Sequence, residues 1–229
     1  MLIYVRILAV VACCTFATRA SAEDIRVFAL VDVSGSMANS VYSSSISRLE
    51  LATQALERLV YQLVDDDIRA VISVDIWNGS FLAGRGMSAT ELRDDTIDGV
   101  QQQIRTVLQF RPSGATHTGA GLSAVLDTLD TVYLCLPTAV IIVTDDPPNN
   151  IHQSHFAAQA NRAFERRITL SYLLLAHVNV SQAETYFARY GQTDDRLRQT
   201  FADNGQLDWS DYVNNLVQLA ADRHVCVLG

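Results

Sequence analysis

Four short apolar segments constrain the fold of this chain more than any other feature of its sequence. They are rich in β-branched residues, too short for helices and apolar on both faces, and they cover Ile25–Val31, Ala70–Trp77, Thr138–Val143 and Ile168–Leu175. Near-continuous apolar strands of this kind are typical of parallel sheets that are covered by helices on both faces.

Apolar residues recur at helical spacing in the intervening segments, over residues 49–63, 100–108, 122–129, 156–164 and 209–220. This alternation of strands and helices predicts an α/β domain with right-handed crossovers. We expect a Rossmann-like, doubly wound, mostly parallel central sheet with helices on both faces. Because no internal repeat, low-complexity tract or linker interrupts the pattern, one domain is expected over residues 23–229.

The charge of the chain excludes two classes of partner. Its 229 residues include 17 basic side chains, all of them arginine, and 25 acidic ones, for a formal net charge of −8. Nucleic-acid binding is not expected because no basic run or stripe is present. An anionic membrane surface is an equally poor partner.

The first 22 residues, Met1–Ala22, have the pattern of a signal peptide. An early arginine precedes the apolar segment Ile7–Ala17, and a small-x-small cleavage site follows at residues 20–22. The stretch is shorter than the ~20 apolar residues that span a bilayer, and Arg19 interrupts it. We expect export to the periplasm or the exterior, with no membrane span after cleavage. Lipoprotein processing at Cys13 stays open as an alternative.

Two cysteines, Cys135 and Cys226, remain after the predicted cleavage. An even count in an oxidising compartment is consistent with one disulfide. Cys135 precedes the third predicted strand, at the amino-end face of the sheet, and the last helix returns toward the same face. A structural Cys135–Cys226 disulfide is therefore expected, with two unpaired buried thiols as the alternative.

Polar residues follow the first and third predicted strands. The first ends in Asp32-Val33-Ser34-Gly35-Ser36 and the third in Thr144-Asp145-Asp146, while a segment at residues 113–119 opens a helix between them. The carboxyl ends of parallel strands are where open α/β sheets place their sites. These three segments supply carboxylates and hydroxyls and contain no lysine or arginine.

The side chains of Asp32, Ser34 and Ser36 can converge on one point because alternate residues of an extended segment share a side. Gly35 between the serines predicts a tight turn. Oxygen ligands of this kind suit a hard divalent cation such as Mg²⁺. The alternative is that these residues only cap the following helix.

The segment Asp32-Val33-Ser34-Gly35-Ser36 resembles the first motif of the metal-ion-dependent adhesion site of von Willebrand factor A-type (VWA) domains. The segment Gly114–Leu122 resembles the second loop of that site, with Thr116 as its threonine, and Thr144-Asp145 resembles the third element. The resemblance covers nearly all of the chain after the predicted signal peptide. The chain is similar to a family of exported bacterial VWA proteins of unassigned function.

This resemblance implies a set of metal ligands and a partner. Ser34, Ser36 and Thr116 would bind the cation directly, and Asp32 and Asp145 would bind it directly or through water. The cation would be Mg²⁺, with Mn²⁺ or Ca²⁺ as alternatives, and a protein partner would supply a carboxylate to it. The resemblance thus implies a binding protein and not an enzyme.

Several alternatives stay open at this point. The usual third element is Thr-Asp-Gly, whereas here Asp146 replaces the glycine, so Asp146 could be the site aspartate instead of Asp145. A metal-dependent hydrolase would need a general base, for which His117 and Asp146 are the candidates. A scaffold with a vestigial site is a third possibility. His152-x-x-His155 lacks the further ligands of a zinc site and is read as a loop entering a helix.

Overall fold

The central sheet has six strands, β1 (Ile25–Asp32), β2 (Ala70–Trp77), β3 (Met87–Glu91), β4 (Thr138–Thr144), β5 (Thr169–Leu175) and β6 (Arg198–Phe201). Their order in the sheet is β3-β2-β1-β4-β5-β6. Strand β3 pairs antiparallel with β2, and the other pairings are parallel. The computed structural model describes residues 25–41, 45–78, 82, 85–130, 136–175, 180–202 and 207–224.

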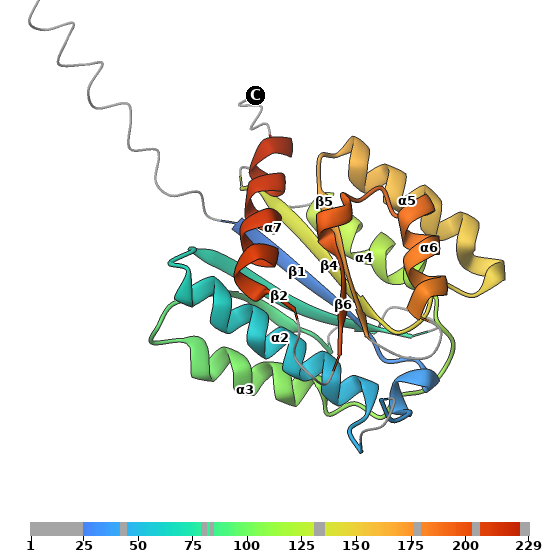
Figure 1. Cartoon of the computed structure of the whole chain (residues 1–229), viewed down its shortest axis with the longest axis horizontal. Helices are drawn as coiled ribbons and strands as arrows, with labels where there is room; N and C mark the ends of the chain where they lie inside the picture. Colours follow the sequence, from blue (N-terminus) through green and yellow to red (C-terminus); the bar gives the residue numbers. More distant parts are fainter. Residues whose placement is uncertain are drawn as a thin grey trace, which may run out of the picture.

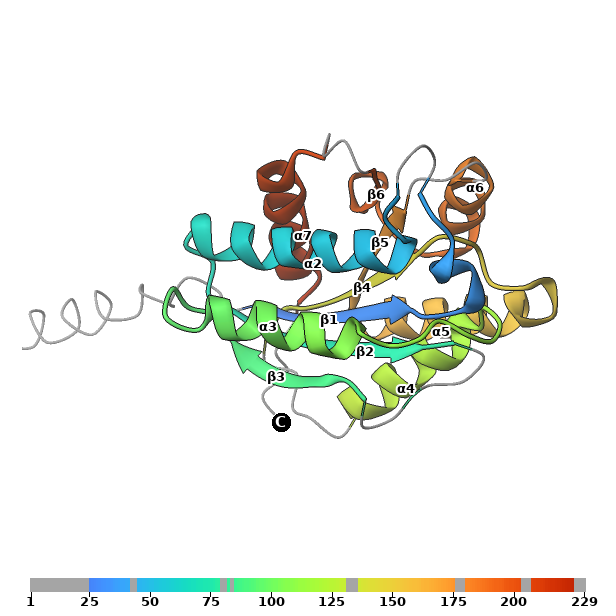
Figure 2. The ribbon, with the colours of Figure 1, turned by 90° about the horizontal axis from the view of Figure 1, so that it is seen from below.

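Helices cover both faces of this sheet (Figures 1 and 2). One face packs against α2 (Arg48–Asp65), α3 (Ile97–Leu108) and α7 (Trp209–Arg223), and the other against α4 (Thr118–Asp130), α5 (Gln153–Glu165) and α6 (Val180–Tyr190). The sequence prediction of a doubly wound, mostly parallel α/β sheet is therefore confirmed.

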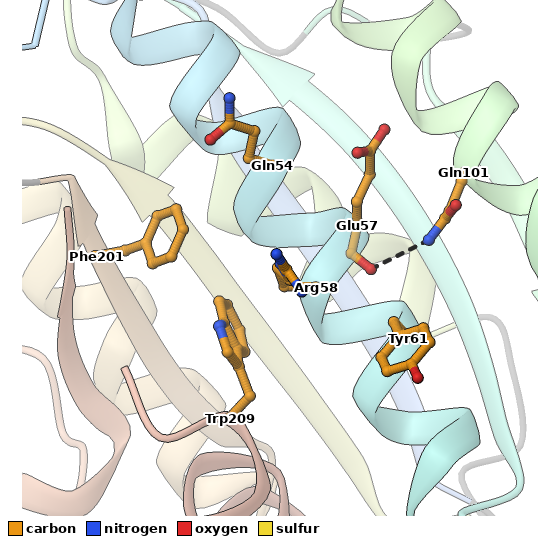
Figure 3. A pocket seen from close by; sticks show the side chains of 7 residues that line it. All are labelled: Gln54, Glu57, Arg58, Tyr61, Gln101, Phe201 and Trp209. Atoms are coloured by element: carbon orange, nitrogen blue, oxygen red, sulfur yellow. Dashed lines mark hydrogen bonds between the residues drawn. The ribbon is translucent and has the colours of Figure 1, made fainter. Parts of the chain in front are cut away.

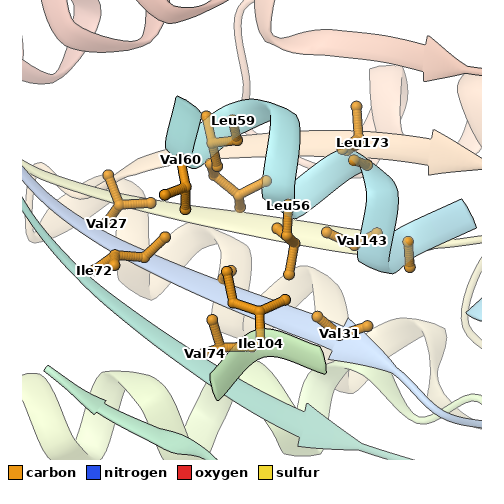
Figure 4. Packing of buried hydrophobic residues seen from close by; sticks show 14 of the residues in the cluster. Val27, Val31, Leu56, Leu59, Val60, Ile72, Val74, Ile104, Val143 and Leu173 are labelled. Atoms are coloured by element: carbon orange, nitrogen blue, oxygen red, sulfur yellow. The ribbon is translucent and has the colours of Figure 1, made fainter. Parts of the chain in front are cut away.

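Helix α2 shows why the sequence folds this way. Its N-cap Ser47 accepts a hydrogen bond from the Glu50 N–H at 3.1 Å, which satisfies one of the free amide groups of the first turn. Its apolar face lies across β1 and the neighbouring strands, where Leu56 and Leu59 are wholly buried (Figure 4). Full burial of each such side chain stabilises the fold by roughly 1.5–3 kcal/mol relative to exposure.

The opposite face has a more aromatic core. Phe156 of α5 and Phe187 of α6 contact Tyr172 of β5, and the rings of Tyr172 and Phe187 stack with their centroids 4.4 Å apart. The Tyr172 hydroxyl is buried and donates a hydrogen bond to the Gly191 carbonyl at 2.8 Å. The hydroxyl therefore keeps a partner inside this apolar layer.

All four predicted strands are present, and each predicted end lies within one residue of the observed one. Three elements were not predicted: β3, β6 and α6. The predicted signal peptide, Cys13, Cys135 and Cys226 lie outside the described residues. Within the part of the chain that is described, no helix has the length and apolar character needed to span a membrane.

Candidate metal centre at the carboxyl edge of the sheet

Two adjacent strands bring the candidate site together. Asp32 is the last residue of β1, and Asp145 directly follows the last residue of β4, with which β1 pairs in parallel. From β1 the chain passes through α2 to β2 on one side of the strand, whereas β4 lies on its other side. The point where the strand order reverses is where open α/β sheets bind ligands.

The loop after β1 is anchored by its apolar residues. Val33 and Met37 are wholly buried, and the Val33 N–H donates to the Trp77 carbonyl at 2.8 Å. The loop continues as a single 3-10 turn, η1 (Gly35–Ala38). A Cβ on Gly35 would meet only a carbonyl oxygen, at an ordinary 3.5 Å. The predicted tight turn at Gly35 is present as η1, and it does not require a glycine, because the 3-10 turn has a backbone that other residues adopt as well.

The glycine that the site requires is in the second loop. Gly114 has a φ of +83°, in the left-handed region that favours glycine. Its carbonyl accepts from the Gly35 N–H at 3.1 Å, and the Ser113 N–H donates to the Val33 carbonyl at 2.9 Å. The third loop joins through the Asn149 N–H, which donates to the Thr116 carbonyl at 3.2 Å. The first and third loops are thus both tied to the second by backbone hydrogen bonds.

Side-chain hydrogen bonds link the five predicted site residues. Thr116 Oγ1 donates to Ser34 Oγ at 3.2 Å, the Ser34 and Ser36 hydroxyls lie 3.0 Å apart, and Ser36 Oγ donates to Asp145 Oδ1 at 3.0 Å. Asp32 joins through the Ser34 N–H, which donates to its Oδ1 at 2.7 Å. The structure thus brings all five residues into one cluster, which we call the carboxylate–hydroxyl cluster.

Both carboxylates of this cluster are completely buried, with 0% exposure for Asp32 and Asp145. The pKa of Asp32 is raised to about 7, first by desolvation and then by the negative charge of Asp145. Hydrogen bonds from Ser34 and from Thr144 Oγ1, which donates to Asp32 Oδ2 at 2.8 Å, lower this pKa and offset part of the effect. The cluster therefore holds negative charge in a place where water cannot compensate it.

Of the two candidate aspartates, Asp145 is the one whose carboxylate accepts from the hydroxyl cluster. Asp146 is half-buried, and its backbone contacts the Thr144 hydroxyl: the carbonyl lies 3.0 Å from Thr144 Oγ1 and the amide nitrogen 3.4 Å from it. The geometry therefore favours the alignment that places Asp145 in the third element.

Arg48 is a member of the site that sequence reasoning missed. Its guanidinium forms an ion pair with Asp145 Oδ2, and the Arg48 side chain is only 15% exposed. Arg48 is the first residue of α2 and lies 97 positions before Asp145 in the chain, so no local pattern pointed to the contact. A buried arginine that contacts a buried carboxylate supplies the positive charge that the cluster otherwise lacks.

Three of the five histidines of the chain gather beside the second loop. The ring of His117 stacks on that of His152 with centroids 3.6 Å apart, and His117 Nε2 lies 3.1 Å from His155 Nδ1. His152 and His155 are half-buried where α5 begins, so the expected exposed loop is in fact a packed histidine cluster. Sequence spacing could pair His152 with His155, but only the fold adds His117.

The carboxylate–hydroxyl cluster offers oxygen atoms, which are the donors that hard divalent cations prefer. Within the described ranges, no group of three or more His, Cys, Asp or Glu side chains is placed to hold a metal ion. The cluster instead combines two carboxylates with three hydroxyls. This donor set fits Mg²⁺ or Mn²⁺, since the two carboxylates would balance the charge of the ion.

A groove of about 530 Å³ lies elsewhere, along the exposed side of α2. Figure 3 shows Phe201 and Trp209 on one side of it and the α2 residues on the other. Glu57 in this groove is already engaged, because its side chain pairs with Arg105 and its carbonyl accepts from Gln101 at 3.4 Å. Glu57, the acidic residue of this groove, is therefore already paired with a basic one.

Fold and polar edge together define a doubly wound α/β domain with a candidate site at its switch point. The sequence matches no protein-family model and no curated protein. Among solved structures, a conserved hypothetical protein, BatB from Bacteroides thetaiotaomicron, is similar over 86% of this chain and 99% of its own, with a TM-score of 0.61 and 14% identity. Manganese-loaded TRAP from Plasmodium vivax is similar over 86% of this chain and 74% of its own, with a TM-score of 0.55 and 19% identity.

The von Willebrand factor type A structure from Catenulispora acidiphila has a TM-score of 0.51 at 14% identity; the similarity covers 89% of this chain and 43% of that one. This chain thus spans less than half of that protein. The similarities establish the fold: the chain folds as a VWA-type domain, as its motifs predicted.

Proposed function

We propose that this protein binds a divalent cation at the carboxylate–hydroxyl cluster and, through the cation, a carboxylate of a protein partner. The observation that carries this proposal is the pair of wholly buried carboxylates, Asp32 and Asp145, linked to three hydroxyls in one hydrogen-bonded cluster. Ser34, Ser36 and Thr116 would hold the ion, together with the two aspartates directly or through water. The bound ion would supply an electrophilic centre for an acidic ligand.

The comparison with TRAP supports the choice of cation, because that similar structure is manganese-loaded. Hydroxyl ligands are neutral, so they add no negative charge to that of the two aspartates and leave the ion able to accept a further carboxylate. We further propose that residues 1–22 are a signal peptide and that the protein acts in the periplasm or outside the cell.

Binding is proposed in preference to hydrolysis because His117, one of the two candidate general bases, is engaged with other histidines. His117 has its Nε2 within hydrogen-bond distance of His155 and its ring stacked on His152. A base must be able to reach a metal-bound water with a free nitrogen. His152 and His155 therefore hold the His117 ring in place, with its Nε2 directed at His155.

Calorimetric titration with Mg²⁺, Mn²⁺ and Ca²⁺ tests the metal site. The purified protein is expected to bind at least one of these ions, and Asp32→Asn is expected to weaken binding by more than about a hundredfold, because it removes one of two charged ligands. Asp98→Asn is the matched control, since Asp98 is exposed on α3 and loses the same charge. Equal binding by wild type and Asp32→Asn would contradict the assignment.

The carboxylate partner is tested with acetate as the probe on the Mn²⁺-loaded protein. Acetate is expected to displace water from the bound ion and so to lower the water-proton relaxation enhancement. Acetamide has a similar size without the charge and is the control. If acetate and acetamide have the same effect, the site does not select a carboxylate.

A further inference from the structure

Arg48 gives the candidate site a positive charge that its sequence motifs do not contain. The guanidinium pairs with Asp145 Oδ2, the oxygen that does not accept from Ser36. The arginine side chain is 15% exposed and the aspartate side chain is 0% exposed, so this pair is largely shielded from solvent. In this environment an ion pair keeps most of its electrostatic strength.

The position of Arg48 is fixed by the backbone around the first loop. Its N–H donates to the Asn39 carbonyl at 3.0 Å, directly after the 3-10 turn that carries Ser36. The start of α2 and the serine loop are therefore parts of one connected segment. The Arg48 guanidinium therefore contacts Asp145 next to the hydroxyl of Ser36, which donates to the same carboxylate.

The contact between Arg48 and Asp145 is incomplete. Arg48 Nε is buried and has no hydrogen-bond partner among the described residues. Bidentate pairing, with two parallel N–H donors on one carboxylate, is the strong form of this interaction. Here one donor of the guanidinium is unsatisfied, so the arginine balances the charge of Asp145 without filling its own hydrogen-bonding capacity.

Counting charges shows why Arg48 matters for metal binding. When both carboxylates are ionised, as they would be around a bound cation, they and the guanidinium have a net charge of −1, and the two carboxylates with a divalent cation have a net charge of zero. With both the cation and Arg48 in place the cluster would carry +1, and a buried surplus charge is unfavourable. A third carboxylate, which the proposed function assigns to a partner, would remove that surplus.

We propose that Arg48 and a divalent cation compete for Asp145, so that Arg48 sets the metal affinity of the site. This inference rests on the proposed function, because it concerns the same ion. It assigns Arg48 as the internal counter-ion of the metal-free protein. Metal binding then separates the guanidinium from Asp145.

The first test compares Mg²⁺ affinity by calorimetry in wild type, Arg48→Gln and Arg105→Gln. Arg48→Gln is expected to bind Mg²⁺ at least about tenfold more tightly, since the competing charge is gone. Arg105→Gln removes an equal charge from a half-exposed pair with Glu57 on the neighbouring helix, and it is expected to change the affinity by less than about twofold. The pair of variants separates a local effect from a change in net charge.

The second test uses the wild-type protein, so it does not depend on the folding of a variant. Phenylglyoxal modifies accessible guanidinium groups, and mass spectrometry of the peptides reports the rate at each arginine. Saturating Mg²⁺ is expected to raise the rate at Arg48 several-fold, because the ion pair that shields it opens. Arg105 is the internal reference and is expected to keep its rate.

The outcomes distinguish this inference from the function on which it rests. If wild type binds Mg²⁺ but neither the affinity of Arg48→Gln nor the reactivity of Arg48 changes, the competition is overturned and the metal site stands. If Arg48→Gln binds and wild type does not, the competition is supported in its strongest form. If no form of the protein binds any cation, the proposed function and this inference fail together.

Discussion

Two regions of this molecule are equally buried and differ in what burial does to them. Leu56, under α2, and Asp32, at the end of β1, are both 0% exposed. Removal from water stabilises the leucine and raises the free energy of the ionised aspartate, which is why the pKa of Asp32 rises to about 7. The apolar layer creates the fold, and the fold then holds a cluster that would not be stable alone. A carboxyl group whose pKa is raised this far by burial is a mark of functional sites.

The largest expected difference between the two regions is in how pH affects the free energy of unfolding in metal-free buffer. The pKa of Asp32 is about 7 in the folded protein against an ordinary value of 3.8. Between about pH 4 and pH 7 the folded protein therefore keeps a proton that the unfolded chain has lost, and stability falls as pH rises through this range. The full difference between the two pKa values corresponds to at most roughly 4 kcal/mol.

Asp32→Asn removes this titration while keeping the shape of the side chain. The variant is expected to lose less stability than wild type between pH 4.5 and pH 7.5, as measured by urea unfolding without divalent cations. At pH 7 it is expected to be the more stable of the two. If the free energy of unfolding changed with pH in the same way in both proteins, the Asp32 carboxylate would not be the source of the pH dependence.

The second prediction concerns the apolar region. Leu56→Ala leaves a cavity between α2 and the sheet and is expected to lower the free energy of unfolding by roughly 3 kcal/mol. Because this substitution changes no titratable group, the loss of unfolding free energy should be the same at pH 5 and at pH 7. Urea unfolding at both values measures it. A loss that varied strongly with pH would mean that the two regions are energetically coupled.

The apolar region was predictable from sequence, and the reason is its regular pattern. Continuous β-branched segments such as Thr138–Val143 favour a buried strand, and the observed β4 begins at the predicted residue and ends one residue later, at Thr144. Strands β3 and β6 were missed because they are only five and four residues long; β3 is largely exposed and β6 is mostly half-buried, so neither carries a clear hydrophobic pattern. Helix α6 did carry a signal, since Ala183 and Phe187 are buried at helical spacing.

The polar region was predictable only in part. Asp32, Ser34 and Ser36 lie together in sequence, the parallel topology indicated that Asp145 would join them, and the resemblance to the second loop of VWA domains pointed to Thr116. Arg48 and the contact of His117 with His155 depend on where helices begin, which no local motif determines. Long-range pairs of this kind come from the packing of the whole domain.

The third prediction lies at the border of the two regions, where α4 meets α5. A Cβ on Gly119 would stand 2.8 Å from the Phe156 backbone nitrogen and 3.0 Å from His155 Nδ1. Backbone atoms cannot yield as a flexible side chain does, so Gly119→Ala is expected to destabilise the protein by roughly 2 kcal/mol. Thermal unfolding measures this loss. Gly99→Ala, where a Cβ meets nothing within 4 Å, is the control.

The smallest effects come from two glycines of the site loops. Gly114 has a φ of +83°, and a Cβ there would lie 3.3 Å from Asn78 Nδ2, so Gly114→Ala is expected to cost about 1–2 kcal/mol. Gly35→Ala meets only ordinary contacts and is expected to stay within roughly 0.5 kcal/mol of wild type.

This pair tests which loop the cluster depends on. Gly114 stands two residues before Thr116 and binds the first loop through its carbonyl, so its replacement should also weaken Mg²⁺ binding by calorimetry. Gly35→Ala should leave that affinity nearly unchanged, although Gly35 lies between the two serines. The reverse order of effects would mean that the serine loop needs a conformation other than its 3-10 turn when the cation is bound.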